Sequence, residues 1–238
     1  MTPPTRRRPA GVAIAVALVL AAMGFAMLGV WQLERRVQKH ALIAAVDART
    51  RAAPMEAPGP RDWHGIDAES DAYRHIRATG RYRPNRRTLV RAVSDLGAGY
   101  WVIEPLDTGR FALLINRGFI PQGRRDADLP TPQGQVTVTG LLRVTEPGGA
   151  FLRANNPAAD RWFSRDVGAI ARARSLPDAA PYFLDADAAA NGSGQPLGGL
   201  TVIRFADNHL VYALTWFGMA ALSLWGLWHI ALPRPSDE

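Results

Sequence analysis

The chain has no cysteine at any of its 238 positions. This absence excludes disulfide bonds, thiolate metal sites and a cysteine nucleophile. Common catalytic motifs are missing too: the sequence has no HExxH pair, no Gly-rich phosphate loop and no GxSxG elbow. Since no residue constellation indicates catalysis, we expect a protein that is not an enzyme.

Acidic residues are fewer than basic ones, 21 against 28, and the formal net charge is +7. This excess of basic residues has two alternative explanations. One is an arginine-rich genome, and the other is a positive charge that attracts anionic lipid or an acidic partner. A nucleic-acid partner is not expected, because no recognition motif accompanies the charge.

Long uncharged apolar runs are present near both ends. The first extends from Ala10 to Leu33 and the second from His209 to Leu232. About 20 apolar residues cross a bilayer, because a helix rises about 1.5 Å per residue and the hydrocarbon core is about 30 Å thick. The sequence therefore predicts two transmembrane helices on either side of a large extramembrane domain.

The first apolar run is about twice as long as the apolar part of a cleaved signal peptide, which favours an uncleaved anchor. Two spans place both termini on one side of the membrane, and Arg6–Arg8 favour the cytoplasm for that side. The chain is predicted to begin with a basic cytoplasmic tail (residues 1–9) and a transmembrane helix (10–33). A β-rich domain outside the cytoplasm (34–208) follows, and then a second transmembrane helix (209–232) and a cytoplasmic tail (233–238).

The segment after the first span keeps helical character to about Arg51. Beyond it, short runs rich in β-branched and aromatic residues predict strands, one of them interrupted at Pro105, and a short helix is predicted at Asp166–Arg174. The predicted strands are Tyr73–Thr79, Thr88–Val93, Tyr100–Ile103, Phe111–Ile115, Val136–Val144, Tyr182–Leu184 and Leu200–Phe205. We expect an α+β domain built on a mainly antiparallel sheet or open barrel.

His209 opens the second apolar run, so it is expected at the membrane surface on the domain side. Imidazole is a good axial ligand for haem iron. Helix positions i, i+3 and i+7 share a face, which places Tyr212 and Trp216 beside His209, where a planar macrocycle could lie. Arg204 could meet a haem propionate or a lipid phosphate. The same residues are typical of a membrane interface without any ligand, and the residues alone leave both interpretations open.

Two other features of the sequence suggest specific roles. Asn116-Arg117-Gly118 closes the buried run Phe111–Ile115; Gly118 is expected to supply an unusual backbone angle, and Arg117 is either a structural arginine or a carboxylate binder. His229 lies about 30 Å further along the second helix, so it and His209 cannot ligate one iron.

Four motifs occur in order along the chain. They are LGVWQLER at Leu28–Arg35, TGRY at Thr79–Tyr82, a central pattern from Gly99-Tyr100 through Glu104-Pro105-Leu106 to Leu113–Pro121, and NHLVYALTWF at Asn208–Phe217. With these motifs and its two-span layout, the chain resembles the surfeit-locus-one family, the assembly factors of haem–copper cytochrome c oxidase. It departs from the family pattern at Phe119, where tryptophan is usual, and at Gln38-Lys39, where the family often has Trp-Lys.

The resemblance implies a bacterial inner-membrane protein with a periplasmic domain, or a mitochondrial counterpart that faces the intermembrane space; the short basic tail favours a bacterium. It implies that the protein binds haem a and assists its insertion into oxidase subunit I. The haem iron would be ligated by His209, with Tyr212 and Trp216 against the macrocycle and Arg204 near the propionates. The implied partners are subunit I, with haem a synthase as a further candidate, and membrane lipid.

Two other classes of function remain open. One is a cofactor-free membrane scaffold that stabilises an assembly intermediate of oxidase subunit I. The other is a membrane-anchored receptor or sensor, which the short predicted tails disfavour because a sensor would normally carry a cytoplasmic output domain.

Overall fold

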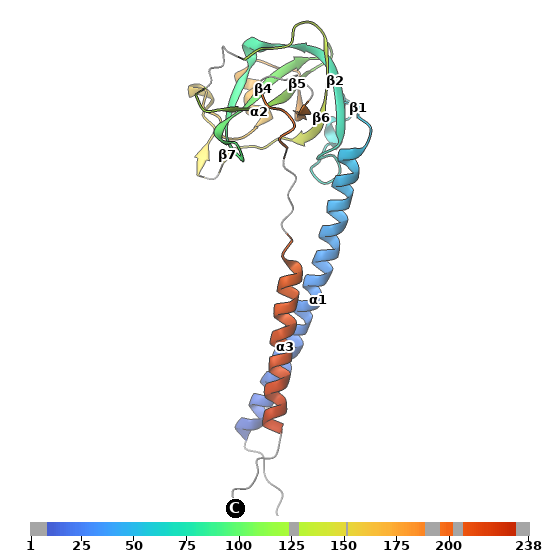
Figure 1. Ribbon diagram of the computed structural model, residues 1–238, viewed down its shortest axis with the longest axis vertical. Coiled ribbons are helices and arrows are strands. Elements are labelled where there is room, and N and C mark those ends of the chain that lie inside the picture. Colours follow the sequence, from blue (N-terminus) through green and yellow to red (C-terminus); the bar gives the residue numbers. More distant parts are fainter. Residues whose placement is uncertain (1–8, 124–128, 151, 189–195, 202–206, 232–238) are drawn as a thin grey trace, which may run out of the picture. The chain divides into compact units, whose positions relative to one another are not determined.

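A computed structural model describes residues 9–123, 129–150, 152–188, 196–201 and 207–231 (Figure 1). The chain divides into two units, which are described separately below. One unit comprises residues 1–44 and 204–238, and the other comprises residues 45–203.

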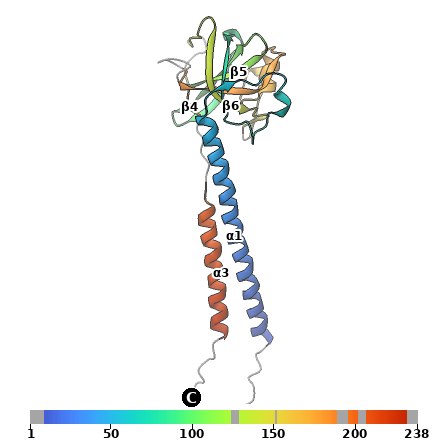
Figure 2. The same cartoon turned by 90° about the vertical axis from the view of Figure 1, so that its right-hand side faces the viewer.

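The first unit consists of two long helices that lie side by side (Figure 2). Helix α1 spans Pro9–Arg51 and α3 spans His209–Ala231. Both are long and apolar enough to cross a membrane, which confirms the two predicted candidate spans. Helix α1 also continues to Arg51, as its helical character beyond the apolar run predicted. The membrane limits placed at Leu33 and His209 stay predictions, and the predicted tails lie largely outside the described residues.

The second unit is a closed barrel of five strands. These strands are β2 (His75–Tyr82), β4 (Gly97–Asp107), β5 (Ala112–Pro121), β6 (Val136–Val144) and β9 (Ala179–Ala186). They pair in the order β2-β6-β9-β5-β4, and a further pairing of β2 with β4 closes the ring. Only β5 and β9 run parallel among these neighbours. The β-rich, mainly antiparallel fold is therefore confirmed, with the barrel closed.

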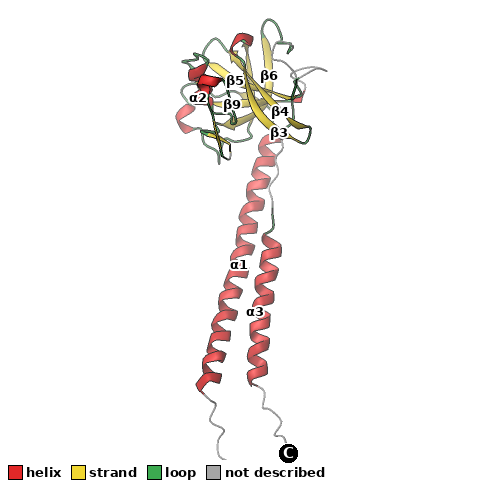
Figure 3. Cartoon of the chain, turned by 90° about the vertical axis from the view of Figure 1, so that its left-hand side faces the viewer, coloured by secondary structure: helices red, strands yellow, loops and turns green. Residues whose placement is uncertain are grey.

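Short elements surround the barrel (Figure 3). β1 (Met55–Glu56) lies parallel beside β2, and β3 (Thr88–Ser94) lies antiparallel beside β4. β7 (Gly149–Ala150) and β8 (Arg153–Ala154) form a hairpin of their own. Helix α2 (Val167–Ala173) packs against β9. The 3₁₀ turns η1, η2 and η4 lie at Trp63–Gly65, Pro84–Arg86 and Pro157–Ala159, respectively.

Strand β5 is buried on both faces, which explains its continuous apolar run. Leu113 and Ile115 belong to the core cluster that also contains residues of β2, β6 and β9. Ala112 and Leu114 belong to a second cluster, formed with residues of α2. Because successive strand residues point to opposite faces, this one strand contributes to two cores.

The expected interruption at Pro105 is wrong, because β4 runs through this residue to Asp107. The carbonyl of Pro105 accepts a hydrogen bond from the amide of Arg83, just past the end of β2. The backbone nitrogen and carbonyl of a strand residue point to the same side of the strand. The position where Pro105 lacks an N–H therefore faces β2, at the point where the pairing of β4 with β2 ends. The strand predicted at Leu200–Phe205 is not present at residues 200 and 201, and its remainder lies outside the described residues.

Acid is expected to destabilise the barrel through Asp107. A hydrogen bond from Arg83 lowers the pKa of this carboxyl below its ordinary value, and the Gly109 amide, 2.9 Å away, adds to the effect. Because the folded pKa lies below the unfolded one, Asp107 stabilises the fold above about pH 4, and this contribution is lost as the pH falls through the folded pKa. Between about pH 5 and about pH 3, the Tm of the full chain in detergent micelles should fall more steeply in wild type than in Asp107→Asn, which cannot titrate. Equal slopes would refute the assignment.

Candidate functional site

The N-terminus of α3 and the middle of α1 share a polar cluster. At the start of α3, the Asp207 carboxylate accepts a hydrogen bond from the His209 amide at 3.2 Å. A helix leaves its first amides without partners inside the helix, and an aspartate just before the first turn satisfies one of them. The sequence Asp-Asn-His therefore begins the helix and fixes the position of the His209 side chain.

The ring of His209 is held by Gln32 of α1. Its Nδ1 lies 2.8 Å from Gln32 Oε1, and the ring is half-buried. A carbonyl oxygen can only accept a hydrogen bond, so Nδ1 carries the proton and Nε2 keeps its lone pair in the neutral ring. Nε2 has no hydrogen-bond partner among the residues that the structure describes. This tautomer leaves Nε2 able to bind a metal ion or to accept a proton.

Asp207 also bonds to α1 through a second histidine. His40 Nε2 lies 2.7 Å from Asp207 Oδ2, and Arg36 Nε lies 3.7 Å from the same oxygen. The hydrogen bond with His40 lowers the pKa of Asp207, and the amide of His209 and the charge of Arg36 contribute further. Asp207 is thus a carboxylate at neutral pH that joins α1 to the start of α3.

Further along the helices the contacts between α1 and α3 become apolar. Trp216 stacks on Phe25 with ring centroids 5.7 Å apart and an angle of 23° between the planes. Phe217 packs against Gly29, where an added Cβ would lie 2.6 Å from the ring. Small residues allow such close approach of two helices in lipid.

The candidate residues from the sequence are thus distributed in three ways. His209 and Trp216 both contact α1, through Gln32 and Phe25. Tyr212 is 54% exposed. Arg204 lies outside the described residues. The cluster of Gln32, His40 and Asp207 was not predicted; the only local signal was polar residues at the ends of the apolar runs.

Gly29 provides a test of this helix pairing. Gly29→Val is expected to separate α1 from α3, because its side chain would overlap the Phe217 ring. The chain lacks cysteine, so Leu18→Cys with Gly226→Cys reports the pairing by crosslinking; the leucine methyls lie within 4 Å of the Cβ position at Gly226. The crosslink yield should fall with Gly29→Val. It should not fall with Gly24→Val, because an added Cβ there has no neighbour within 4 Å. Equal yields in both would contradict the packing.

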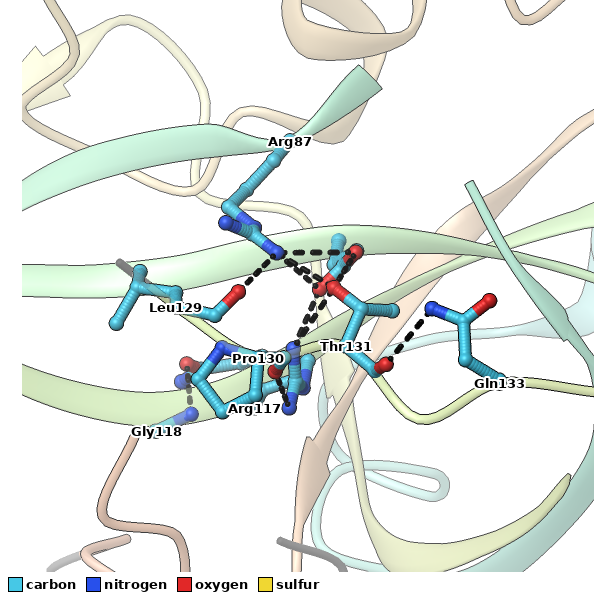
Figure 4. A network of polar contacts seen from close by, with 9 residues as sticks. Arg87, Arg117, Gly118, Leu129, Pro130, Thr131 and Gln133 are labelled. Carbon is cyan, nitrogen blue, oxygen red and sulfur yellow. Dashed lines mark hydrogen bonds and ion pairs between the residues drawn. The ribbon is translucent and has the colours of Figure 1, made fainter. Parts of the chain in front are cut away.

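The barrel contains a buried ionic network that the sequence did not predict. The Glu104 side chain is fully buried and accepts hydrogen bonds from Arg117 Nη1 at 2.7 Å and from Thr131 Oγ1 at 2.8 Å. Arg87 Nη2 lies 3.4 Å from both carboxylate oxygens and donates to Thr131 Oγ1 at 2.6 Å. Figure 4 shows Arg87, Arg117 and Thr131 converging on one carboxylate. Arg117 thus binds a carboxylate of the chain itself, in a structural role.

A second buried carboxylate, Asp185 of β9, joins several segments. It accepts hydrogen bonds from Asn116 Nδ2 at 2.7 Å, Arg143 Nη1 at 2.8 Å, Thr201 Oγ1 at 3.0 Å and Arg165 Nη1 at 3.2 Å. Every one of these donors comes from a different part of the unit, so the carboxylate organises the fold. Among the described residues, no group of three or more His, Asp or Glu side chains is placed to hold a metal ion.

Fold and site together define a class of protein that has two candidate membrane helices, a β-barrel domain between them in the sequence, and a histidine held at the start of the second helix. Residues 19–221 match the family model described as the SURF1 family. The chain belongs to the SURF1 family, which confirms the resemblance read from its motifs.

Individual relatives support this membership. Surfeit locus protein 1 of Mus musculus is 32% identical over 225 residues, covering 84% of this chain and 70% of that protein. The Homo sapiens protein of the same name is 31% identical over 224 residues, covering 84% and 71%. A SURF1-like protein of Monosiga brevicollis is 33% identical over 216 residues, covering 83% and 79%.

Proposed function

We propose that this protein is an assembly factor for haem–copper cytochrome c oxidase that holds haem a through His209 and assists its insertion into subunit I. Membership of the SURF1 family supports the assembly role. The observation that carries the haem assignment is the hydrogen bond from His209 Nδ1 to Gln32 Oε1.

The hydrogen bonding of the His209 ring is that expected of a histidine that ligates haem iron. Metal-binding histidines usually donate their second ring N–H to a carbonyl or carboxylate, which fixes the tautomer and the orientation of the ring. Gln32 does this for His209 and leaves Nε2 for the iron. When bound, haem a supplies an iron that takes an axial imidazole. The half-buried ring keeps its free nitrogen accessible, as the delivery of a cofactor requires.

The aromatic residues of α3 have separate roles in this proposal. Trp216 is stacked on Phe25, so it holds the two helices together and offers only its remaining surface to a macrocycle. The exposed Tyr212 is one turn from His209 and offers a free aromatic side chain. The pairing of Arg204 with a propionate stays a prediction, because this residue lies outside the described residues.

The proposed location is the bacterial inner membrane, with both termini in the cytoplasm and the barrel in the periplasm. An apolar haem made in the membrane is best held at the bilayer surface, and His209 opens a helix long and apolar enough to cross it. Subunit I is the proposed partner, with haem a synthase as a further candidate. The protein is proposed to bind and transfer the cofactor without catalysing a reaction.

Haem content is the measurement that tests this proposal. The full chain, coexpressed with the haem a pathway and purified in detergent, should contain haem a identified by its spectrum and by extraction. His209→Ala is expected to lower the haem content by about tenfold or more, because the iron loses its protein ligand. Gln32→Leu should weaken haem binding by about tenfold while leaving some bound, because the ring loses its orienting partner.

His229→Ala is the matched control, since it removes a histidine near the far end of the same helix, where the ring contacts Trp225 and Trp228. Its haem content should equal that of wild type. Full haem content in His209→Ala would reject the ligand assignment.

A second candidate function is a cofactor-free scaffold that stabilises an intermediate of subunit I. The same hydrogen bond favours it, because Gln32 and His209 also tie α1 to α3 in the absence of any ligand. Copurification with subunit I is expected for both functions. Wild-type protein that copurifies with subunit I and contains no haem would favour the scaffold.

A further inference from the structure

A groove beside β3 combines positive charge with aromatic and small side chains. Its volume is about 290 Å³. Small residues line the part formed by β3 and β4, and Tyr100 and Phe163 supply aromatic surface. Arg91 of β3 and Arg153 of β8 complete the lining from two sides. Such a groove can take an extended chain with side chains on both sides.

The two arginines of the groove have no acidic partners among the residues that the structure describes. Their guanidinium carbons lie 5.9 Å and 5.7 Å from the centre of the same Phe163 ring, for Arg91 and Arg153 respectively. Both side chains are exposed, and neither forms an ion pair with a carboxylate in the part of the chain that the structure describes. Two like charges held at one ring repel each other, so an anionic group between them is favoured.

The strand beside this groove has an open edge. β3 is the last strand of its sheet, and on its outer side Val90 forms a bridge with Trp162, in which the Arg91 amide donates a hydrogen bond to Trp162 O at 2.9 Å. Because outward backbone groups alternate along a strand, the next outward amide and carbonyl belong to Val93. No described residue is hydrogen-bonded to them on that side. An open edge of this kind is a template for an added strand.

Exposed apolar side chains lie next to the charged groove. Val93 is 86% exposed, and Leu152, in the turn between β7 and β8, is 88% exposed. Leu152 has a φ of +58°, a conformation that a leucine adopts at a cost in free energy. Exposed apolar side chains beside charged ones offer contacts to the side chains of a bound segment.

We propose that this groove binds an extended acidic segment of a partner protein. The segment would pair with the outward amide and carbonyl of Val93, place carboxylates on Arg91 and Arg153, and pack apolar side chains against Val93 and Leu152. An anionic lipid offers negative charge but no ladder of alternating donors and acceptors, so the open edge favours a peptide. The groove is formed by the barrel domain, without residues of α3, and is independent of the proposed role of His209.

A labelled peptide tests the proposal on the full chain in nanodiscs of zwitterionic lipid. A peptide that alternates glutamate and valine should bind, as measured by fluorescence anisotropy, and its lysine counterpart should not. Arg91→Glu with Arg153→Glu should weaken binding by at least about tenfold. The control variant Arg81→Glu reverses the charge of an exposed residue on β2 that has no carboxylate partner among the described residues. It should change the affinity for the peptide by less than about twofold. The Tm of each variant checks that the barrel remains folded.

Two further outcomes would overturn the proposal. A peptide methylated at alternate amide nitrogens cannot add to a strand edge, and it should bind at least about tenfold more weakly; equal binding would exclude strand addition. If the peptide fails to bind while vesicles of phosphatidylglycerol bind through Arg91 and Arg153, the groove contacts a lipid surface instead.

Discussion

Replacing Glu104 with alanine is expected to lower the free energy of unfolding of the barrel by about 3–5 kcal/mol. The side chains of Arg117 and Arg87 are 2% and 5% exposed, and both lie against the Glu104 carboxylate. Removing the carboxylate leaves these buried guanidinium groups without their shared counter-charge. Most single domains have a total stability of about 5–15 kcal/mol, so this loss would affect the yield of folded protein.

The matched control for this prediction is an ion pair at the surface. Glu56 pairs with Arg77 at 2.6 Å, but their side chains are 72% and 50% exposed. Glu56→Ala should therefore cost less than about 1 kcal/mol. Denaturant unfolding of the full chain in micelles, followed by tryptophan fluorescence, measures both variants. Glu104→Ala should be partly rescued by Arg117→Met, since the second change removes one of the two buried charges that Glu104 neutralises in wild type. A similar small cost for both carboxylates would show that the buried network contributes little.

Local patterns predicted much of the fold. The apolar runs predicted both long helices, and alternating β-branched residues predicted β6 with its observed bounds, Val136–Val144. The short helix α2 begins where Asp166 accepts a hydrogen bond from the amide of Ala169, which is a local capping interaction. These features depend on residues that are close together in the sequence.

Long-range contacts explain what could not be predicted. The ring closes through Tyr82↔Leu106, and β5 pairs with β9, almost 70 residues further on. Glu104 stands between apolar residues, and nothing near it indicates that Arg117 and Thr131 surround it. At the candidate site, the sequence singled out His209 but not Gln32, which lies 177 residues away. The haem assignment itself stays a prediction until it is measured.

Gly118 is the one position where a predicted backbone feature and a close contact coincide. Its φ of +129° confirms the unusual angle expected from the sequence. An added Cβ would lie 2.1 Å from the carbonyl oxygen of Leu197, a backbone atom that cannot rotate away. Phe119 and Leu197 exchange two hydrogen bonds of 2.9 Å and 3.0 Å next to this contact. Gly118→Ala should therefore displace the segment 196–201 from the barrel.

The expected cost of Gly118→Ala has two parts, and Gly97→Ala separates them. Gly97 has a φ of +97°, but an added Cβ there has no neighbour within 4 Å, so only backbone strain of about 1–3 kcal/mol is expected. Gly118→Ala adds the loss of both hydrogen bonds with Leu197, about 1 kcal/mol each, and should exceed the control by about 2 kcal/mol. Because Thr201 lies in the same segment and donates to Asp185 at 3.0 Å, displacement should also speed proteolysis there. Equal losses of unfolding free energy in the two variants would mean that residues 196–201 contribute no stability through this contact.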